Sequence, residues 1–465
     1  MNQLDMKELE KAIDHVWQIT ERFGLDPFPI HFEVVPASIM YEFGAYGLPG
    51  RFSHWTHGRA YQQTKTMYDY GLSRIYELVI NTNPAYAFLM DGNTVTQNKL
   101  VVAHVVAHCD FFRNNVYFAN TNRQMLEGVT VNADRIRMYE FQHGQLEVEQ
   151  FLDAVLSIQE HVDPHVSMRK ERRDERKRSG PPETPYDDIF ELGAAKPAPE
   201  PPRKRRFPEE PEKDLLLFIA EHAPDLEDWQ RDVLHIVRSE MLYFVPQMQT
   251  KIMNEGWACY WHVRIMRELD LPEQEYVEFA HLHANVVAPS KRSLNPYYVG
   301  MKMFEDIERR WDNPTAEERE VFGRKGNEGR EKIFEVRALE NDAAFIRNYL
   351  TQELVDDLDL YIYKVEGDEL KVVEKDFEKI RAMIVGSMAN FGNPYIVVED
   401  GDYRGGRELY LKHAYEGQEI DVDYAEKTLR YVHYLWRRPV HLETVLNDKP
   451  VVLTYDGERN TKRLL

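Results

Sequence analysis

Cysteine is scarce in this chain. Only two of the 465 residues are cysteines, Cys109 and Cys259. A small secreted fold held together by disulfides needs more cysteines than this, at closer spacing. The sequence therefore predicts a protein of a reducing compartment, and the cytoplasm is the expected location.

Long apolar runs are also missing from the sequence. No stretch reaches the roughly 18 consecutive apolar residues that a membrane-spanning helix requires. The N-terminal stretch MNQLDMKELEKAIDHVWQITERFG carries acidic residues early and has no apolar core of signal-peptide length. We therefore expect no membrane span.

Positive charge is in the minority. The chain holds 58 lysines and arginines against 79 aspartates and glutamates, which gives a formal net charge of −21. Non-specific binding to nucleic acid depends on attraction between a basic surface and the phosphate backbone. The basic runs RKERRDERKR and PPRKRR lie in one proline-rich stretch, so a nucleic-acid partner is not expected. No phosphate-binding loop of the Walker type is present.

The organisation of the chain can be read from its composition and periodicity. Helical spacing of apolar residues predominates in residues 1–163 and again in residues 213–330. Between them, residues 164–212 are rich in proline and charge, which predicts a disordered linker. Residues 331–465 mix strand-like and helical stretches, as is typical of a small α+β domain. The expected fold is therefore mainly α, with a smaller C-terminal α+β domain.

A pair of histidines lies in the apolar segment QNKLVVAHVVAHCDFF. His104 and His108 are four residues apart, so on a helix they share one face. Two imidazoles at this spacing are a common half-site for zinc or another divalent metal. A buried imidazole needs a partner, and a carbonyl or carboxylate can serve as well as a metal. The pair is thus a candidate metal or catalytic site, with structural histidines as the alternative.

A second helical segment, KIMNEGWACYWHVRIMREL, offers a carboxylate. Glu255, Cys259 and His262 fall on one helical face. The stretch NEGWACYW resembles the Glu-Gly-Trp-Ala stretch that supplies the third ligand in some metallopeptidases of the gluzincin type. This resemblance implies a gluzincin-like helical core in which His104, His108 and Glu255 bind a divalent metal, with zinc as the first candidate. Cys259 and His262 are then expected next to the ligands.

The sequence departs from the peptidase pattern at one position. In HExxH, the glutamate after the first histidine is the general base, and here that position is Val105. Asp110, His262 and Glu278 are the candidate catalytic residues that would replace it. Without such a replacement, the site is not that of an ordinary metallopeptidase.

Two further polar clusters are candidates for a pocket around this site. The loop YGLPGRFSHWTHGRAYQQ carries Arg51, His54 and His57 among aromatic residues. Such a loop can line a pocket for an anionic or sugar-like ligand, or it can be purely structural. His281, in EYVEFAHLHANVV, is a candidate neighbour of the metal ligands.

Five segments together resemble the stage V sporulation protein R family. They are DPFPIHFEVVPASIMYEFGAYGLPGRFSHWTHG, KLVVAHVVAHCDFFRNN, KIMNEGWACYWH, LNPYYVGMKMFEDIE and RELYLKHAYEGQEIDVDYAEKTLRYVHYLW. The resemblance extends over nearly the whole chain. It implies a cytoplasmic protein needed for formation of the spore cortex peptidoglycan. It also implies two partners in bacteria that do not sporulate, a serine kinase of the PrkA type and a YhbH/YeaH-type protein.

Two functions follow as hypotheses. The first is a sporulation protein that uses a divalent metal at His104, His108 and Glu255 for a hydrolytic or amide-forming step. The second is a non-catalytic scaffold that links a serine kinase to cortex synthesis or to a starvation response. Val105 in place of the peptidase base, the charged linker and the C-terminal domain favour the second.

Overall fold

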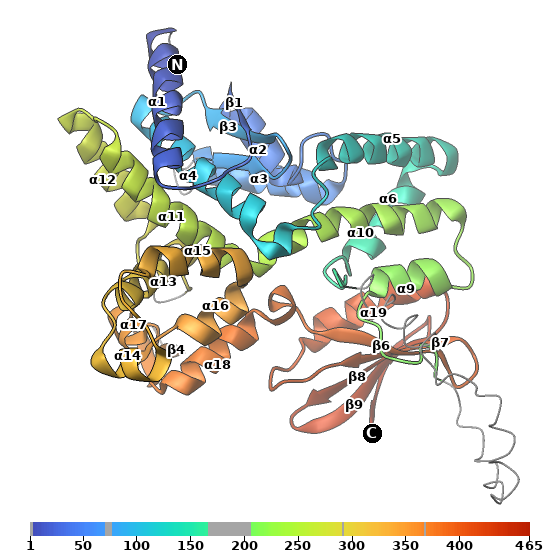
Figure 1. The fold of residues 1–465 in the computed structure, drawn as a ribbon. Coiled ribbons are helices and arrows are strands. Elements are labelled where there is room, and N and C mark those ends of the chain that lie inside the picture. Colours follow the sequence, from blue (N-terminus) through green and yellow to red (C-terminus); the bar gives the residue numbers. More distant parts are fainter. Residues whose placement is uncertain (1–2, 70–76, 166–205, 291–292, 367–368) are drawn as a thin grey trace, which may run out of the picture. The chain divides into compact units, whose positions relative to one another are not determined.

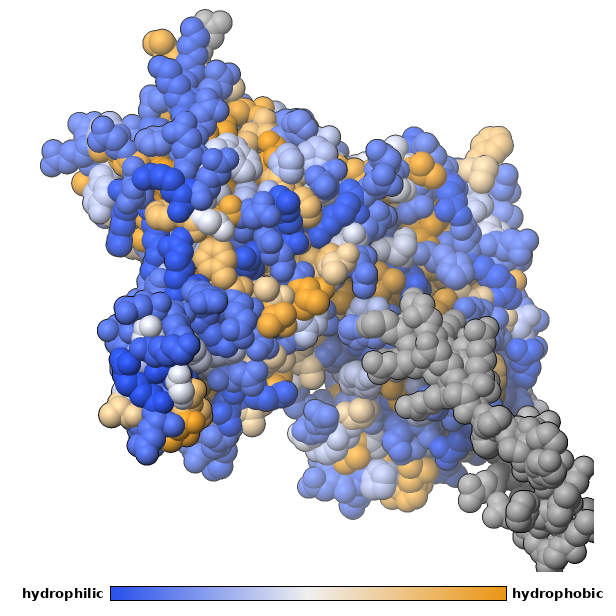
Figure 2. Space-filling view, viewed as in Figure 1, coloured by the Kyte–Doolittle hydropathy of each residue, from blue (hydrophilic) through white to orange (hydrophobic). Residues whose placement is uncertain are grey.

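The structure is a computed structural model, and it describes residues 3–69, 77–165, 206–290, 293–366 and 369–465. The chain is mainly helical and ends in a strand-rich stretch (Figure 1), so the predicted fold class is confirmed at this level. No helix among the described residues is both long enough and apolar enough to cross a membrane. The face seen in Figure 2 is mostly hydrophilic, with hydrophobic residues in separate patches.

The chain forms two compact units, each built from two separate stretches. Unit 1 comprises Met1–Met138 and Tyr243–Gly392, and unit 2 comprises Tyr139–Leu242 and Asn393–Leu465. This division differs from the four consecutive segments expected from composition. Residues 331–392 join unit 1 because their buried apolar side chains, among them Ile333 and Phe345, belong to the same core as the N-terminal helices.

Unit 1 holds most of the helices. Its elements are α1 (Gln3–Arg22), β1 (Ile30–Val35), α2 (Ala37–Tyr46), α3 (Trp55–Asp69), β2 (Glu77–Ile80), β3 (Ala85–Met90), α4 (Val95–Asn114), η1 (Val116–Phe118), the start of α5 (Met125–His143), the end of α10 (Asp228–Gln249), α11 (Lys251–Glu268), α12 (Glu273–Val286), α13 (Pro296–Asp312), α14 (Ala316–Phe322), α15 (Gly329–Leu339), α16 (Asp342–Tyr349), α17 (Gln352–Asp357), β4 (Ile362–Glu366), β5 (Glu369–Glu374), α18 (Phe377–Ser387) and η3 (Ala389–Gly392).

Helix α4 lies at the centre of unit 1. Thr94 caps its start: its hydroxyl accepts a hydrogen bond from the Gln97 N–H at 3.1 Å, and the Gln97 side chain accepts one from the Thr94 N–H. Nearly every side chain between Asn98 and Phe112 is buried, so this helix is covered on all sides. A helix that is apolar all round belongs in a core, and α4 packs there against α1, α11 and α12.

A small sheet lies beside α4, with strand order β1-β3-β2. β1 and β3 are parallel, whereas β2 and β3 are antiparallel and pair Glu77 with Leu89. The short connection from β3 to α4 brings the start of β2 to the same side of unit 1 as α4. This position matters because Glu77 is the first residue of β2.

Helices α11 and α13 approach each other closely at two glycines. A Cβ atom added at Gly256 would lie 2.3 Å from the carbonyl carbon of Gly300. One added at Gly300 would lie 2.1 Å from the carbonyl oxygen of Ile252. Because the obstacles are backbone atoms, no side-chain movement relieves them, and only glycine allows the two helices to pack at this distance.

Gly256→Ala is therefore expected to destabilise the protein. Forcing a methyl group into a packed interior costs typically about 1–3 kcal/mol, and the backbone contact places this site at the upper end. Gly128→Ala, in α5, is the matched control, because an added Cβ there meets nothing within 4 Å. Chemical denaturation of both variants tests this, and equal stabilities would contradict the close approach of α11 and α13.

Unit 2 combines helices with a five-stranded sheet. Its elements are the end of α5, α6 (Gln145–Leu156), α9 (Leu215–His222), the start of α10, β6 (Ile396–Tyr403), β7 (Glu408–His413), α19 (Val422–Trp436), β8 (Val440–Leu446), β9 (Lys449–Tyr455) and β10 (Asn460–Leu464). The strand order is β10-β9-β8-β7-β6. Only β7 and β8 are parallel, and α19 connects them and packs on the sheet.

Most of the predicted linker, residues 166–205, lies outside the described residues. The last residues of the predicted linker, 206–212, are described, and Glu212 pairs with the edge strand β6 of the sheet in unit 2. The Glu212 N–H donates to the Val398 carbonyl at 3.0 Å, and the Val398 N–H donates back to Glu212 at 2.7 Å. The stretch from 206 to 212 therefore belongs to unit 2 and extends its sheet beyond β6.

Candidate metal centre

Four side chains of unit 1 converge on one point. They are Glu77, His104, His108 and Glu255, and one donor atom from each lies within 4.8 Å of the other three. His104 Nε2 lies 3.4 Å from Glu77 Oε1 and 3.6 Å from Glu255 Oε2. His108 Nε2 lies 3.7 Å and 3.4 Å from the same two oxygens. The three ligands predicted from the sequence are thus brought together, and Glu77 joins them.

Three elements of unit 1 position these side chains, β2, α4 and α11. His104 and His108 are one turn apart on α4, and both are buried. Glu255 lies in the first turns of α11, whose cap residue Thr250 provides no side-chain cap. Instead, the Asp342 carboxylate accepts the Ile252 and Met253 N–H groups at 2.8 and 2.9 Å. A residue from α16 thus fixes the end of α11 that carries Glu255.

The distances within the group fit metal ligands better than hydrogen bonds. Separations of 3.4–3.7 Å between nitrogen and oxygen exceed those of a good hydrogen bond. Ligands at about 2.0–2.2 Å from a tetrahedral ion would be about 3.3–3.6 Å apart. His104 Nε2 and Glu255 Oε2 are buried and make no hydrogen bond. These two atoms face each other at 3.6 Å inside a group of four donors, and this arrangement points to an ion at the centre of the group.

The pKa shifts of the group are consistent with a cation at its centre. Burial would raise the pKa of Glu255, but interaction with His104 and His108 outweighs it and lowers this pKa to about 2. Burial and the His104 charge would lower the pKa of His108, yet Glu255 and Glu77 raise it to about 9. Two partly buried carboxylates thus hold positive charge between them, either as protons on the imidazoles or as a divalent cation.

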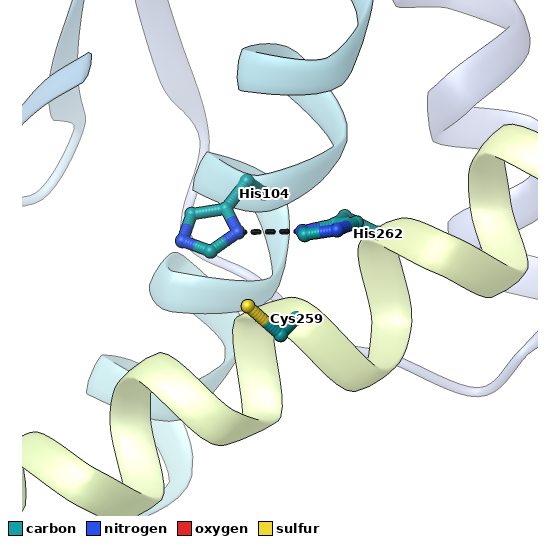
Figure 3. Close-up of side chains that lie close together, drawn as sticks. All are labelled: His104, Cys259 and His262. Carbon is teal, nitrogen blue, oxygen red and sulfur yellow. Dashed lines mark hydrogen bonds between the residues drawn. The ribbon is translucent and has the colours of Figure 1, made fainter. Parts of the chain in front are cut away.

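The other ring nitrogens of the two histidines are also bonded. His108 Nδ1 lies 2.8 Å from Asn254 Oδ1 on α11. His104 Nδ1 lies 2.8 Å from His262 Nδ1, and Figure 3 shows this contact between α4 and α11 with Cys259 one turn away on the same helix. Such bonds orient a metal-binding imidazole and leave the lone pair of its Nε2 free for an ion.

Tyr297 and Cys259 complete the surroundings. The Tyr297 ring stacks on His104 with centroids 6.1 Å apart. Burial, together with the Glu255 and Glu77 carboxylates, raises the pKa of Tyr297, so it stays a phenol and can donate a hydrogen bond. Burial likewise raises the pKa of the Cys259 thiol, which groups with His104 and His262. Tyr297 was not among the predicted site residues, although its segment LNPYYVG carries part of the family resemblance.

Of the three predicted catalytic residues, only His262 contacts a member of the group. Asp110 is fully buried elsewhere on α4, where its carboxylate accepts from the Asp26 N–H at 2.8 Å and the Trp257 Nε1–H at 2.9 Å. Arg337 Nη1 lies 3.2 Å from it. The Asn114 side-chain amide donates to it at 3.3 Å. With four partners, this carboxylate favours a structural role for Asp110.

The remaining predicted residues lie in other surroundings. Glu278 on α12 accepts a hydrogen bond from the Thr94 hydroxyl at 2.7 Å, at the start of α4. His281, on the same helix, is exposed.

The loop before α3 is built around its own aromatic residues. Arg51 Nη1 donates to the Tyr46 carbonyl, and His54 Nδ1 pairs with Thr56 Oγ1 at 2.7 Å. The His57 ring packs against Tyr46. Burial, with Arg51 and His54 nearby, lowers the pKa of His57 to about 4. The described contacts of this loop favour a structural role over a pocket.

The fold and the site define a helical protein whose core holds two histidines and two glutamates arranged as a metal site would be. Sequence comparison gives its family. Residues 3–393 match the family described as "SpoVR like protein", and residues 394–447 match "SpoVR-like C-terminal domain". The chain therefore belongs to the SpoVR family, as its motifs predict. The second match begins next to Asn393, where the C-terminal stretch of unit 2 starts.

One curated relative is similar along its length. It is a protein of Escherichia coli (strain K12) described as "Uncharacterized protein YcgB", which is 31% identical over 480 positions. The match covers 96% of this chain and 93% of the relative. No solved structure matches the chain.

Proposed function

We propose that this protein binds one divalent metal ion through Glu77, His104, His108 and Glu255, and that it uses the ion in a hydrolytic or amide-forming step of sporulation. Membership of the SpoVR family supports the sporulation-related role. The geometry of the four donor atoms supports the ion. We further propose that the step acts on spore cortex peptidoglycan and takes place in the cytoplasm.

The observation that carries the proposal is the pair of buried atoms without hydrogen bonds, His104 Nε2 and Glu255 Oε2, in a group of four donors. Imidazole nitrogen and carboxylate oxygen together suit zinc, iron and manganese, and the gluzincin-like pattern makes zinc the first candidate. When bound, a divalent ion polarises a carbonyl group and so eases its attack by a nucleophile. Tyr297, whose ring stacks on His104, stays a phenol and would supply a hydrogen-bond donor for a substrate oxygen.

Metal analysis of the purified full chain tests this proposal. The protein, after exposure to zinc and removal of the excess, is expected to hold about one equivalent, and His104→Ala and Glu255→Ala are expected to lose it. The same variants should fail to support cortex formation in a spore-forming host that lacks its own copy. A parent protein without metal, or variants that keep it, would refute the metal site.

The scaffold hypothesis is the second candidate, and Val105 favours it. This valine, fully buried beside His104, takes the place of the peptidase base. Among the described residues, the carboxylates in the four-donor group are Glu77 and Glu255, and both are proposed ligands. In this proposal, the metal site is structural and the protein joins a serine kinase of the PrkA type to a YhbH/YeaH-type protein. Kinase binding that persists in His104→Ala, together with intact cortex formation, would favour the scaffold.

A further inference from the structure

We propose that His262 and His283 are positioning residues that hold His104 in the one tautomer able to bind a metal ion through Nε2. The inference deepens the proposed function and rests on its metal site. It concerns a row of three imidazoles from three helices, His104 on α4, His262 on α11 and His283 on α12. Sequence spacing does not predict the contacts between these rings, because they lie on three separate helices and depend on how those helices pack.

The three rings form a continuous row of hydrogen bonds. His104 Nδ1 lies 2.8 Å from His262 Nδ1, as Figure 3 shows, and His262 Nε2 lies 2.9 Å from His283 Nδ1. Both nitrogens of the buried His262 ring are thus used, one on each side. His283 is half-buried, so the row leads from the metal group toward the surface of α12.

Two directions of donation are chemically complete along this row, but only one is compatible with an ion. If His262 donated to His104, the remaining proton of a neutral His104 would be on Nε2, which faces Glu77 and Glu255. An ion bound at Nε2 requires the reverse: His104 Nδ1–H donates to His262 Nδ1. His262 must then carry its own proton on Nε2 and donate it to His283 Nδ1. His283 Nδ1 is thus the final acceptor of the row in the direction that an ion requires, and without it the His262 Nε2–H would have no partner in this row.

The second histidine of the group provides an internal comparison. His108 Nδ1 faces the Asn254 side-chain oxygen, which can only accept, so His108 must donate there and present a bare Nε2. In both histidines the metal-facing atom is Nε2, and the partner that orients the ring contacts Nδ1. This partner is the Asn254 amide for His108 and the His262 imidazole for His104. This comparison identifies asparagine as the substitution that should replace His262 without loss of zinc affinity.

Helix α12 is held in place by contacts that fit this role. The Glu278 carboxylate accepts from the Thr94 hydroxyl at the start of α4, and Lys99 of α4 lies 2.8 Å from Glu275 of α12. These two contacts fasten α12 to the helix that carries His104. They help to place His283 at hydrogen-bonding distance from His262. The role of Glu278 in this arrangement is to hold α12 against α4, outside the metal group.

Zinc affinity, measured by competition with a chromophoric chelator, tests the inference on the full chain. His262→Leu removes the acceptor and is expected to weaken binding about 10–100-fold, as is typical for residues that orient a ligand. His262→Asn keeps an acceptor at the position of Nδ1, so its affinity should stay within about threefold of the parent. His283→Leu should weaken binding by an intermediate factor. His413→Leu is the matched control, because His413 is a buried, hydrogen-bonded histidine of unit 2, and no change is expected.

Cobalt absorption spectra and melting temperatures distinguish a loss of His104 orientation from a general loss of stability. The cobalt spectrum of His262→Asn should match that of the parent, whereas that of His262→Leu should change. Equal affinity in the parent and His262→Leu would overturn the inference, and so would equally weak binding in His262→Asn and His262→Leu at unchanged melting temperatures. If His262→Leu does not fold, parental affinity in His283→Leu together with weak binding in His262→Asn would overturn it as well. A parent chain that binds no metal refutes the proposed function itself, which is a distinct outcome.

Discussion

Glu77→Gln is expected to lower the affinity of the protein for zinc by at least about 100-fold, because residues that merely orient a metal ligand already contribute about 10–100-fold. The substitution replaces one oxygen by an amide nitrogen and keeps the size of the side chain. Glu77 Oε1 lies 3.4 Å from His104 Nε2 and 3.7 Å from His108 Nε2, so it is one of the four converging donors. Two carboxylates balance the charge of a divalent ion, and removal of one leaves a buried positive charge uncompensated.

Glu33→Gln provides the control for this substitution. Glu33 is an exposed glutamate of β1, in the same small sheet as Glu77, and its replacement removes the same charge from the same part of the chain. We expect its zinc affinity to equal that of the parent in chelator competition. Equal affinities for Glu77→Gln and the parent would show that Glu77 is a neighbour of the site and not a ligand, and would reduce the donor set to His104, His108 and Glu255.

Glu77 also shows where sequence reasoning reached its limit. Helical periodicity places His104 and His108 on one face, because it is a local property of the chain. The link from α4 to Glu255, about 150 residues later, came from the likeness of NEGWACYW to a peptidase segment and not from periodicity. Nothing near Glu77 in SRIYELVINTN distinguishes it from a surface glutamate at the start of a strand. It becomes a candidate only through the pairing of β2 with β3 and the short connection of β3 to α4.

Asp110 shows the reverse case, in which helical periodicity alone directs a predicted catalytic residue away from the site. Asp110 follows His108 by two positions, and two residues on an α-helix are about 200° apart around the axis. Asp110 is therefore directed away from the face of His104 and His108, where it pairs with Arg337 and Trp257. Glu278 could not be judged this way, because its position depends on how α12 packs against α4. Local geometry follows from the sequence, whereas helix packing required the structure.

Asp110 supports the second large prediction, which concerns stability. Arg337→Met is expected to lower the free energy of unfolding by about 3–5 kcal/mol, because it leaves a buried carboxylate without its counter-charge. Asp110 is fully buried and Arg337 is 7% exposed, with 3.2 Å between Arg337 Nη1 and Asp110 Oδ2. The Arg337 guanidinium also lies over the Trp257 and Phe334 rings, 5.5 and 5.0 Å from their centroids. Methionine keeps an unbranched apolar side chain at this position, so the loss reports mainly on the charged group.

A double-mutant cycle isolates the pair. Asp110→Asn keeps acceptor oxygen for Asp26 or Trp257 and removes the charge, so the double variant Asp110→Asn/Arg337→Met should be more stable than the sum of the two single losses predicts. Arg309→Met is the matched control for the loss of an arginine, because Arg309 is exposed and its buried partner Asp306 keeps its ion pair with Arg310. Additive losses in the cycle would show that Asp110 and Arg337 do not stabilise each other.

The loss caused by Arg337→Met should also depend on pH. Burial raises the pKa of Asp110, while Arg337 opposes this shift. A raised pKa means that the folded protein keeps a proton that the unfolded chain releases, so stability falls as pH rises through the interval between the two pKa values. Removal of Arg337 raises the folded pKa further and widens that interval. The difference in stability between the parent and Arg337→Met should therefore grow from pH 4 to pH 7, and denaturation at both pH values measures it. A difference that is constant over this range would mean that Asp110 is already uncharged in the parent, and that Arg337 stabilises unit 1 by packing alone.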